Sequence, residues 1–276
     1  MMIASETVLR ELLAFYQEAG VDAAVGETPV DHLAVQESPE PAAATPEPPP
    51  RPPALPVRTL TSRDLATGTH TAPPPPDTAV MAAREAAKTA ADLDALRAIV
   101  DRFEGCALRA TATRLVFARG NPRSRVMFVG EAPGYEEDKS GKPFVGRSGH
   151  LLDAMMAAIG LDETNTYIAN IVPWRPPGNR TPTPQESAIC LPFIKRQIEL
   201  ADPDILVCLG GPSAQTLLNI REGITKSRGR WYPFQTGTRD IRALATFHPA
   251  FLLRSPLQKR LAWRDFLALK KALAQK

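Results

Sequence analysis

The sequence is poor in cysteine, in histidine and in long apolar runs. Only 3 cysteines occur among 276 residues, with no Cys-x-x-Cys pair, which argues against a secreted disulfide framework. No stretch approaches the roughly 18 apolar residues of a membrane-spanning helix, and the N-terminus lacks a signal-peptide pattern. A Gly-x-x-x-x-Gly-Lys-Ser/Thr motif is also absent, which argues against a P-loop nucleotidase. We therefore expect a cytoplasmic protein without a membrane anchor.

Proline, by contrast, is abundant and unevenly distributed. Thirteen of the 28 prolines lie between Pro39 and Pro76, in a stretch rich in Ala, Thr and Glu that cannot bury a core. The run PPPRPP in this stretch is a candidate docking motif for a protein partner that binds polyproline. We predict three regions: an N-terminal helix (5–19) and acidic arm at 1–34, a Pro/Ala-rich disordered linker at 35–80, and a folded domain at 81–276.

Charge divides the chain in a similar way. Residues 1–92 carry 6 Lys/Arg and 13 Asp/Glu, a net charge of −7, whereas residues 93–276 carry 27 and 17, a net charge of +10. A basic domain behind an acidic arm favours a polyanionic partner such as a nucleic acid. An ordinary solvated surface is the alternative explanation.

Apolar runs and helical patterns alternate in the folded domain. Helices are predicted at 83–105, 150–160, 183–200, 213–220 and 257–274, and strands at 126–130, 166–172, 204–210 and 241–247. The strands are almost continuously apolar, which is typical of parallel strands covered on both faces. We therefore predict an α/β fold, a three-layer α/β/α sandwich with a central four-stranded parallel sheet.

Polar and Gly/Pro-rich loops follow all four predicted strands. In such folds the ligand binds at the carboxyl ends of the strands. The loops there are GEAPGYEEDKSGKPFVG, PWRPPGNRTPTP, CLGGPSA and FHPAFLLRS. They bring carboxylates, two asparagines and a histidine to one edge of the sheet, so we expect the functional site at this edge.

These loops resemble the motifs of the uracil-DNA glycosylase superfamily, and within it those of family 4. GEAPGYEEDKSGKPFVGRSGHLL, NIVPWRPPGNRTPTP and FHPAFLLR are similar to three family blocks in their order and spacing, and the resemblance covers about residues 95–276. It implies a uracil-DNA glycosylase-like catalytic domain. Such an enzyme flips uracil out of DNA and hydrolyses its N-glycosidic bond, which leaves an abasic site for base excision repair.

The resemblance also assigns the uracil-binding residues. Phe144 would stack on the flipped base, and the Asn170 amide would pair with its O4 and N3–H edge. His248 would donate a hydrogen bond to uracil O2, where negative charge grows in the transition state. The remaining uracil contacts would come from a Gly/Ala-rich stretch: Gly130, Ala132 and Gly134.

The resemblance leaves the water-positioning carboxylate open between Glu131 and Glu137. Family 1 enzymes carry an Asp where this chain has Ala132, so one of the two glutamates, together with Asn179, would orient the water. Glu137 is also a candidate for excluding the methyl group of thymine, because Gly134 stands where family 1 uses a Tyr. The other two carboxylates of the loop are expected to be solvated or to cap a helix: Glu136 and Asp138.

DNA contacts are implied around the same edge. The helix that opens at Arg147, Ser148 and Gly149 would offer its N-terminal amides to a phosphate. Leu252 or Leu253 would fill the hole left by the flipped base. Phosphates would be contacted by Arg175 and Arg254, and further backbone charge would come from Lys226, Arg228, Arg230, Lys259, Arg260 and Arg264.

The chain departs from family 4 at the iron–sulfur site. Family 4 enzymes typically hold a four-iron, four-sulfur cluster on four cysteines, and Cys106 and Cys190 match two of these positions. Phe103 and Trp174 stand at the other two, and Cys208 lies inside a predicted strand. We therefore predict no metal and no cofactor, with two aromatic rings in place of the cluster.

Two alternatives to the glycosylase stay open. One is a non-catalytic DNA-binding or damage-sensing relative, and the other is a glycosylase for another deaminated base such as hypoxanthine. A branch of the superfamily that cross-links to uracil-DNA carries a reactive histidine in the second block. This chain has no histidine there, which disfavours irreversible capture of uracil-DNA. We expect a monomer that acts on uracil-containing DNA in the bacterial cytosol or nucleoid.

Overall fold

The computed structural model of the protein describes residues 76–275. The acidic arm, the helix predicted at 5–19 and most of the predicted linker lie outside these residues. The linker was predicted to extend to residue 80, but helix α2 (Pro76–Lys88) already begins at Pro76. In the described part of the chain, no helix is long and apolar enough to cross a membrane.

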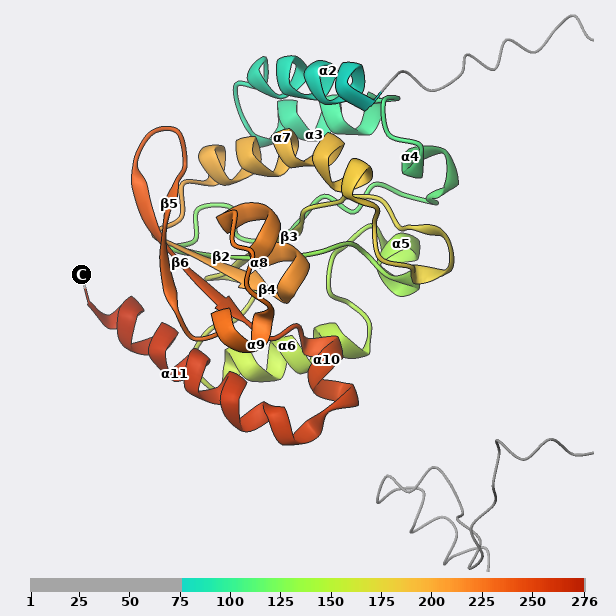
Figure 1. Cartoon of the computed structure of the whole chain (residues 1–276). Helices are drawn as coiled ribbons and strands as arrows, with labels where there is room; N and C mark the ends of the chain where they lie inside the picture. Colours follow the sequence, from blue (N-terminus) through green and yellow to red (C-terminus); the bar gives the residue numbers. More distant parts are fainter. Residues whose placement is uncertain (1–75, 276) are drawn as a thin grey trace, which may run out of the picture. The chain divides into compact units, whose positions relative to one another are not determined.

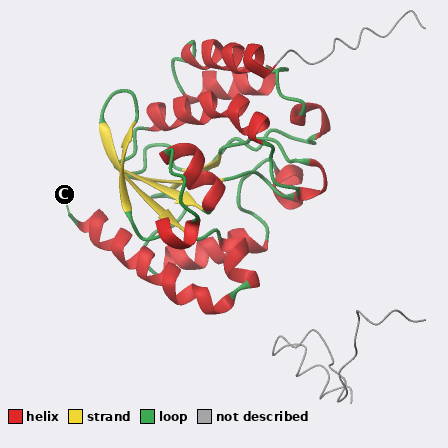
Figure 2. Ribbon diagram, in the orientation of Figure 1, coloured by secondary structure: helices red, strands yellow, loops and turns green. Residues whose placement is uncertain are grey.

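A mixed six-stranded sheet lies at the centre of the described residues (Figures 1 and 2). Its order is β1-β3-β2-β4-β6-β5. The four inner strands run parallel and match the four predicted ones: β3 (Tyr167–Asn170), β2 (Val126–Gly130), β4 (Ile205–Leu209) and β6 (Asp240–Thr246). The predicted all-parallel, four-stranded sheet is therefore too small.

Two antiparallel edge strands were missed, β1 (Arg119–Gly120) and β5 (Trp231–Gln235). The first is only two residues long, too short to create a periodic pattern. The second contains Pro233, which cannot donate to a neighbouring strand and is tolerated at a sheet edge. Neither strand changes the parallel centre that determines where the site forms.

Side chains of the central strands alternate between two hydrophobic cores. In β2, Met127 and Val129 belong to one core, and Val126 and Phe128 belong to the other. All residues of β2 and β4 are buried, because a central strand contacts helices on both faces. This explains the continuous apolar runs, and the predicted α/β/α layering is confirmed.

The helices divide between these two cores (Figure 1). The first core includes residues of α2 and of three further helices: α3 (Leu93–Arg102), α7 (Pro184–Ala201) and α8 (Gly211–Leu218). The second core lies against α6 (Arg147–Ala157) and α11 (Lys259–Ala274). Both layers anchor helices that begin at the loops of the functional edge, so the positions of these loops depend on the two cores.

The single helix predicted at 83–105 is in fact two helices, α2 and α3. The chain turns after Lys88, and Asp92 caps α3 by accepting a 2.8 Å hydrogen bond from the Ala95 amide. The high helix propensity of this stretch favours one long helix, but an aspartate N-cap and the burial of both helices on α7 favour the break. Short helical segments within the loops were also not predicted: α4 (Leu108–Thr111), α5 (Tyr135–Ser140), η1 (Pro177–Asn179), α9 (Ile224–Ser227), α10 (Pro249–Arg254) and η2 (Pro256–Gln258).

The buried centre of the sheet predicts a sharp contrast between two leucines. Leu206 in β4 has no exposed surface, whereas Leu257 in η2 is 85% exposed. Leu206→Ala should lower the free energy of unfolding by about 2–5 kcal/mol, because it leaves a cavity in the first core, between the sheet and one helical layer. Leu257→Ala is the matched control and should change it by no more than about 0.5 kcal/mol. Urea denaturation measures both, and equal losses would contradict the placement of β4.

Candidate functional site

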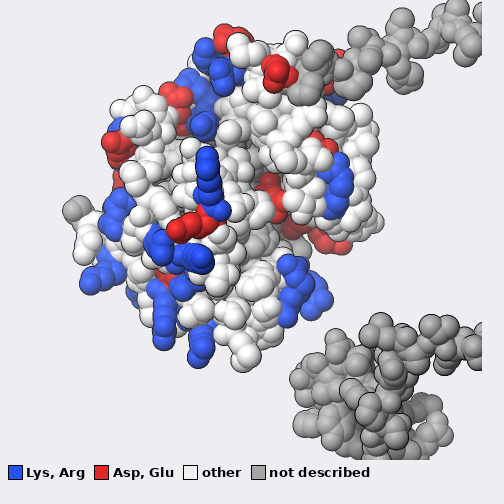
Figure 3. Space-filling view, in the orientation of Figure 1, with Lys and Arg blue, Asp and Glu red and all other residues white. Residues whose placement is uncertain are grey.

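A pocket of about 430 Å³ lies at the carboxyl ends of the four parallel strands. Each strand contributes a lining residue at or just after its end: Glu131 after β2, Asn170 in β3, Gly210 after β4 and His248 after β6. Figure 3 shows a hollow on this face with atoms of Asp or Glu residues inside it and Lys/Arg residues around it. The pocket therefore lies where the fold class predicts a ligand site.

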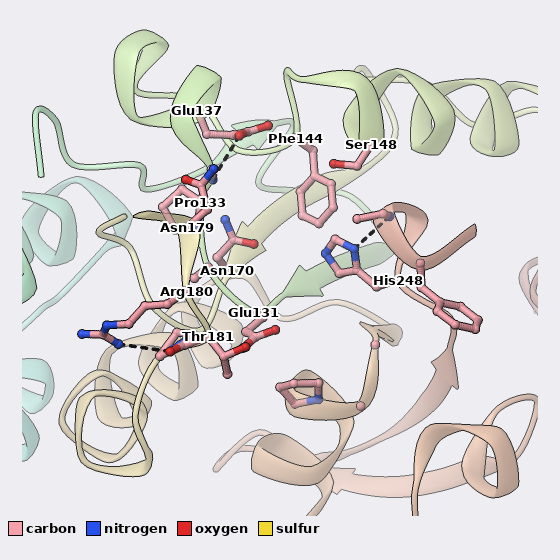
Figure 4. Close-up of a pocket in the computed structure, with 18 of the residues that line it drawn as sticks. Glu131, Pro133, Glu137, Phe144, Ser148, Asn170, Asn179, Arg180, Thr181 and His248 are labelled. Carbon is pink, nitrogen blue, oxygen red and sulfur yellow. Dashed lines mark hydrogen bonds between the residues drawn. The ribbon is translucent and has the colours of Figure 1, made fainter. Parts of the chain in front are cut away.

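Two rings lie face to face in the pocket. The centroids of Phe144 and His248 are 5.5 Å apart, with the ring planes inclined by 29° (Figure 4). Phe144 adopts a φ of +55°, an uncommon conformation for a bulky residue. Strain of this kind concentrates at functional sites, so the loop holds Phe144 in position at an energetic cost.

Two glycines make room for this arrangement. A Cβ on Gly149 would lie only 1.9 Å from the Phe144 carbonyl oxygen. A Cβ on Gly130 would lie 2.5 Å from Asn170 Oδ1 and 2.6 Å from the Phe144 ring. Gly149 therefore allows the close approach of the Phe144 backbone and does not mark an open phosphate site. Gly130 allows the Asn170 amide and the Phe144 ring to approach each other.

His248 is held as a neutral hydrogen-bond donor. Its Nδ1 accepts a 3.1 Å hydrogen bond from the Ala250 amide at the start of α10, so the proton of the neutral ring is on Nε2. Burial lowers the pKa of His248 to about 4, with a further decrease caused by the positive charge of Arg254. At neutral pH the ring is thus uncharged and can donate through Nε2.

Both carboxylate oxygens of Glu137 accept hydrogen bonds from backbone amides of its own loop. One oxygen accepts hydrogen bonds from the amides of Val145 (3.0 Å) and Gly146 (2.9 Å), and the other accepts from the Gly134 amide (3.1 Å). These bonds cap α5 and close the segment that carries Phe144. Glu137 therefore shapes the pocket wall.

Glu131 has the opposite environment. It lines the pocket, and its Oε1 is buried without a hydrogen-bond partner among the described residues. Burial raises the pKa of this carboxyl, because desolvation disfavours the charged form. Asn170 Oδ1 is likewise buried without a partner in the described part of the chain. These two acceptors face a pocket that can supply a ligand or a water.

Asp138 was expected to be solvated or to cap a helix, but it is buried against Thr113. Its oxygens accept hydrogen bonds from the Thr113 amide and hydroxyl, both at 2.8 Å, which ties α5 to a segment 25 residues earlier. Arg175 lies 4.0 Å from Asp138 and donates a 2.6 Å hydrogen bond to Asn179. Arg175 therefore links two loops of the pocket and orients Asn179, while Glu136 is exposed as expected.

Buried groups also support the end of β6. The Thr246 hydroxyl donates a 2.8 Å hydrogen bond to Asp265, which is 2% exposed. Arg228 forms a two-pronged ion pair with Asp265 and lies 5.7 Å from the centroid of the Phe247 ring. Arg228, expected to supply surface charge for DNA, is therefore mainly an internal support for the strand that leads into His248.

The other predicted residues divide into pocket and surface. Ala132, Gly134, Ser148 and Arg254 line the pocket. Arg147 is exposed at the start of α6. Several lining residues were not singled out from the sequence: Arg180, Thr181, Pro182, Gly210, Gly211, Pro212, Ile224, Phe247, Ala250 and Phe251. All of these except Ile224 lie within the loops that follow the predicted strands, and this location was the available signal.

The two leucines expected to fill the hole in the DNA differ in burial. Leu252 has no exposed surface and packs with Phe247 and Ala262, whereas Leu253 is 37% exposed. The sequence left the choice between them open. In this structure only Leu253 presents its side chain at the surface.

Aromatic rings occupy the region of the two matched cysteines. Cys106 and Cys190 are buried free thiols. The Phe103 ring packs edge-on against Phe193 with centroids 4.9 Å apart, and Trp174 is only 2% exposed in the same core. The described residues contain no group of three or more His, Cys, Asp or Glu arranged to hold a metal. These residues do not fit a four-thiolate cluster.

Comparisons with known proteins identify relatives of this chain. A profile described as the Uracil DNA glycosylase superfamily matches residues 117–267. The Type-4 uracil-DNA glycosylase of Thermotoga maritima is 43% identical over 157 residues, which are 56% of this chain and 80% of that protein. The Type-4 uracil-DNA glycosylase of Archaeoglobus fulgidus is 39% identical over 165 residues, which are 58% of this chain and 83% of that protein.

The low pKa of His248 predicts a pH-dependent loss of stability. As the pH falls from about 6.5, the ordinary value of an exposed histidine, toward 4, the unfolded chain binds a proton that the native ring does not. The free energy of unfolding should therefore decrease in this window, by at most about 1.4 kcal/mol per pH unit. Urea denaturation at several pH values measures this decrease. His248→Gln should lack this component, and identical pH profiles for the two proteins would refute the assignment.

Proposed function

Because the chain belongs to the uracil DNA glycosylase superfamily, we propose that it removes uracil from DNA by hydrolysing the N-glycosidic bond. The convergence of Phe144, Asn170 and His248 on one pocket carries this proposal. A flat ring surface, a fixed amide and a neutral imidazole are the three elements that a flipped uracil requires. The abasic site that this reaction leaves would be the starting point of base excision repair.

Asn170 would select uracil through its amide. Its buried Oδ1 has no partner among the described residues, so it can accept the N3–H of uracil while the amide nitrogen donates to O4. Cytosine presents the opposite donor and acceptor pattern at this edge and would leave buried groups unpaired. A site built in this way rejects the wrong base strongly.

His248 would stabilise the departing base. Its Nε2–H, fixed by the Ala250 contact to Nδ1, would donate to uracil O2 as negative charge develops there. A donor that is already in place needs no reorganisation during the reaction, and such electrostatic preorganisation is often the largest single contribution to catalysis.

Glu131 would hold the attacking water. Unlike Glu137, whose oxygens accept three backbone hydrogen bonds, Glu131 has a buried oxygen without a protein partner in the described residues. A carboxylate near C1′ can orient water and stabilise the positive sugar of the transition state. We assign Asn179, oriented by Arg175, a supporting role in placing the same water.

Glu137 would contribute to selectivity through the pocket wall. Its Oε2 lies so close to Gly134 that a Cβ there would be 2.9 Å away. This packed wall is our candidate for the barrier to the thymine methyl group, with Gly134 and Ala132 close to the base. This role differs from that of a water-activating group. Substitutions of Glu137 and of Glu131 should therefore have different effects on stability and activity.

DNA would be held around the pocket mouth. We assign phosphate contacts to Arg147, Ser148 and Arg254, which lie at the start of α6 and the end of α10. Leu253 would replace the flipped base in the stack. The protein would act as a monomer in the cytosol, where its DNA substrate is located, and the polyproline run remains a candidate for binding a protein partner.

We propose that this enzyme works without an iron–sulfur cluster. Phe103 and Trp174 replace two of the four expected thiols, and their rings pack with Phe193 and the surrounding core. Apolar packing would then perform the structural role of the cluster. No step proposed above involves redox chemistry or a metal.

The proposed division between the glutamates gives a direct test of function. On a single-uracil oligonucleotide, Glu131→Gln should slow excision by about 10²–10⁴-fold. Stability should be unchanged or higher, because a carboxylate with one buried oxygen that lacks a partner among the described residues is removed. Glu137→Ala should lower both stability and activity, since three backbone donors lose their acceptor. Glu136→Gln, at an exposed neighbouring carboxylate, is the control and should resemble the parent.

Abasic-site cleavage after alkali reads out the reaction. Binding of the uracil oligonucleotide without any product from the unchanged protein would favour the non-catalytic relative. Product from a hypoxanthine oligonucleotide alone would favour the other-base alternative. Full activity of Glu131→Gln would shift the water-positioning role to another group.

The cluster-free state has its own test. Protein purified without oxygen should contain no stoichiometric iron and no charge-transfer absorbance from iron and sulfide. The double substitution Phe103→Cys and Trp174→Cys is the matched variant, because it restores the four-thiol set and should take up iron on reconstitution. Stoichiometric iron in the unchanged protein would overturn this part of the proposal.

A further inference from the structure

Leu257 is an exposed apolar side chain close to the pocket mouth. It is 85% exposed, more than any other large apolar residue of the described chain. It stands three residues after Arg254, which lines the pocket. Three residues span at most about 11 Å, a distance of roughly three base-pair steps. Its position therefore falls within the footprint of DNA bound at the pocket.

The backbone holds Leu257 in a defined turn. Pro256 begins the 3-10 turn η2, and the Gln258 amide donates a 3.0 Å hydrogen bond to the Ser255 carbonyl. The Ser255 amide in turn donates to the Phe251 carbonyl at 2.9 Å, which connects the turn to the end of α10. Leu257 thus projects from a short, fixed structure that is continuous with the helix carrying Leu253.

The chain segment that contains Leu257 is strongly basic. From Pro249 to the C-terminus the sequence contains one acidic residue, Asp265, and this residue is buried and paired with Arg228. Figure 3 shows basic side chains along the lower edge of this view, where α11 lies in Figure 1. The exposed cations of this segment are Arg254, Lys259, Arg260, Arg264, Lys270 and Lys271. A leucine among cations complements a polyanion that has apolar faces, and DNA provides both features through its phosphates and its stacked bases.

On this basis we propose that Leu257 is a second apolar wedge, which enters duplex DNA beside Leu253 and stabilises the kinked duplex from which uracil is extruded. This inference rests on the proposed function and adds to it a residue that acts when uracil lies in double-stranded DNA. Leu253 fills the position of the flipped base, and Leu257 unstacks a neighbouring step. Inserted apolar side chains of this kind open base steps and bend the duplex.

The proposal predicts an effect that is specific to duplex DNA. Leu257→Ala should reduce kcat/KM on duplex uracil-DNA by roughly tenfold, since unstacking a base step is costly without the wedge. On a single-stranded uracil oligonucleotide, where no stack has to be opened, the change should stay below about twofold. Leu257→Met, which keeps an apolar side chain of similar size, should restore duplex activity.

A second measurement does not require turnover. A duplex carrying a non-hydrolysable uracil nucleotide, with 2-aminopurine at the neighbouring step, becomes more fluorescent when that step is unstacked. The unchanged protein and Leu257→Met should raise the fluorescence, and Leu257→Ala should raise it several-fold less at saturation. Met81→Ala is the control, because Met81 is an exposed apolar residue on α2, far from α10 (Figure 1), and should behave as the parent.

The outcomes separate this inference from the proposed function. Equal duplex activity and equal fluorescence in Leu257→Ala and the parent would overturn the second wedge while leaving the glycosylase intact. An equal loss on both single-stranded and duplex substrates would also overturn it, because a wedge acts only on stacked DNA. A parent without excision on either substrate would overturn the proposed function, and the fluorescence would still decide whether Leu257 unstacks the duplex.

Discussion

The pocket depends on one carboxylate that never has to meet the substrate. Glu137 accepts three backbone hydrogen bonds from Gly134, Val145 and Gly146, and these bonds fold the loop after β2 onto itself. The closed loop forces Phe144 into a positive φ and places its ring against His248. Charge-assisted bonds to backbone amides are strong enough to offset this strain. The charge of Glu137 is therefore architectural.

Two of the groups assigned to the chemistry keep an oxygen that the fold leaves without a hydrogen bond. Glu131 and Asn170 each keep a buried oxygen without a partner in the described residues, and His248 is held neutral by burial. Unpaired buried groups lower stability, but they also remove the need to reorganise solvent when charge develops. The site accordingly combines a rigid wall, formed by groups with complete hydrogen bonds, with a few acceptors and one donor that are available to a ligand.

The layers beneath the pocket support it on two sides through contacts between protein groups. Trp174 lies in the loop after β3 and is buried in the core below α7, one residue before Arg175, which orients Asn179. On the other side, the buried pair of Asp265 and Arg228 supports the end of β6 before His248. Packing and a satisfied ion pair fix the two sides of the pocket, and neither requires a metal.

The sequence by itself determined the parallel centre of the sheet, because strands buried on both faces must be continuously apolar, and it identified the loops at their carboxyl ends. It also singled out Phe144, Asn170 and His248 through their motifs. Only the tertiary structure separated Glu131 from Glu137 and placed Asp138 in a buried contact with Thr113. The Asp138 contact joins residues 25 positions apart, and the bonds from the Val145 and Gly146 amides to Glu137 depend on how the loop folds back on itself. Local sequence pattern carries no record of either. The two edge strands were missed for a similar reason, because their pairing is decided by their neighbours in the sheet.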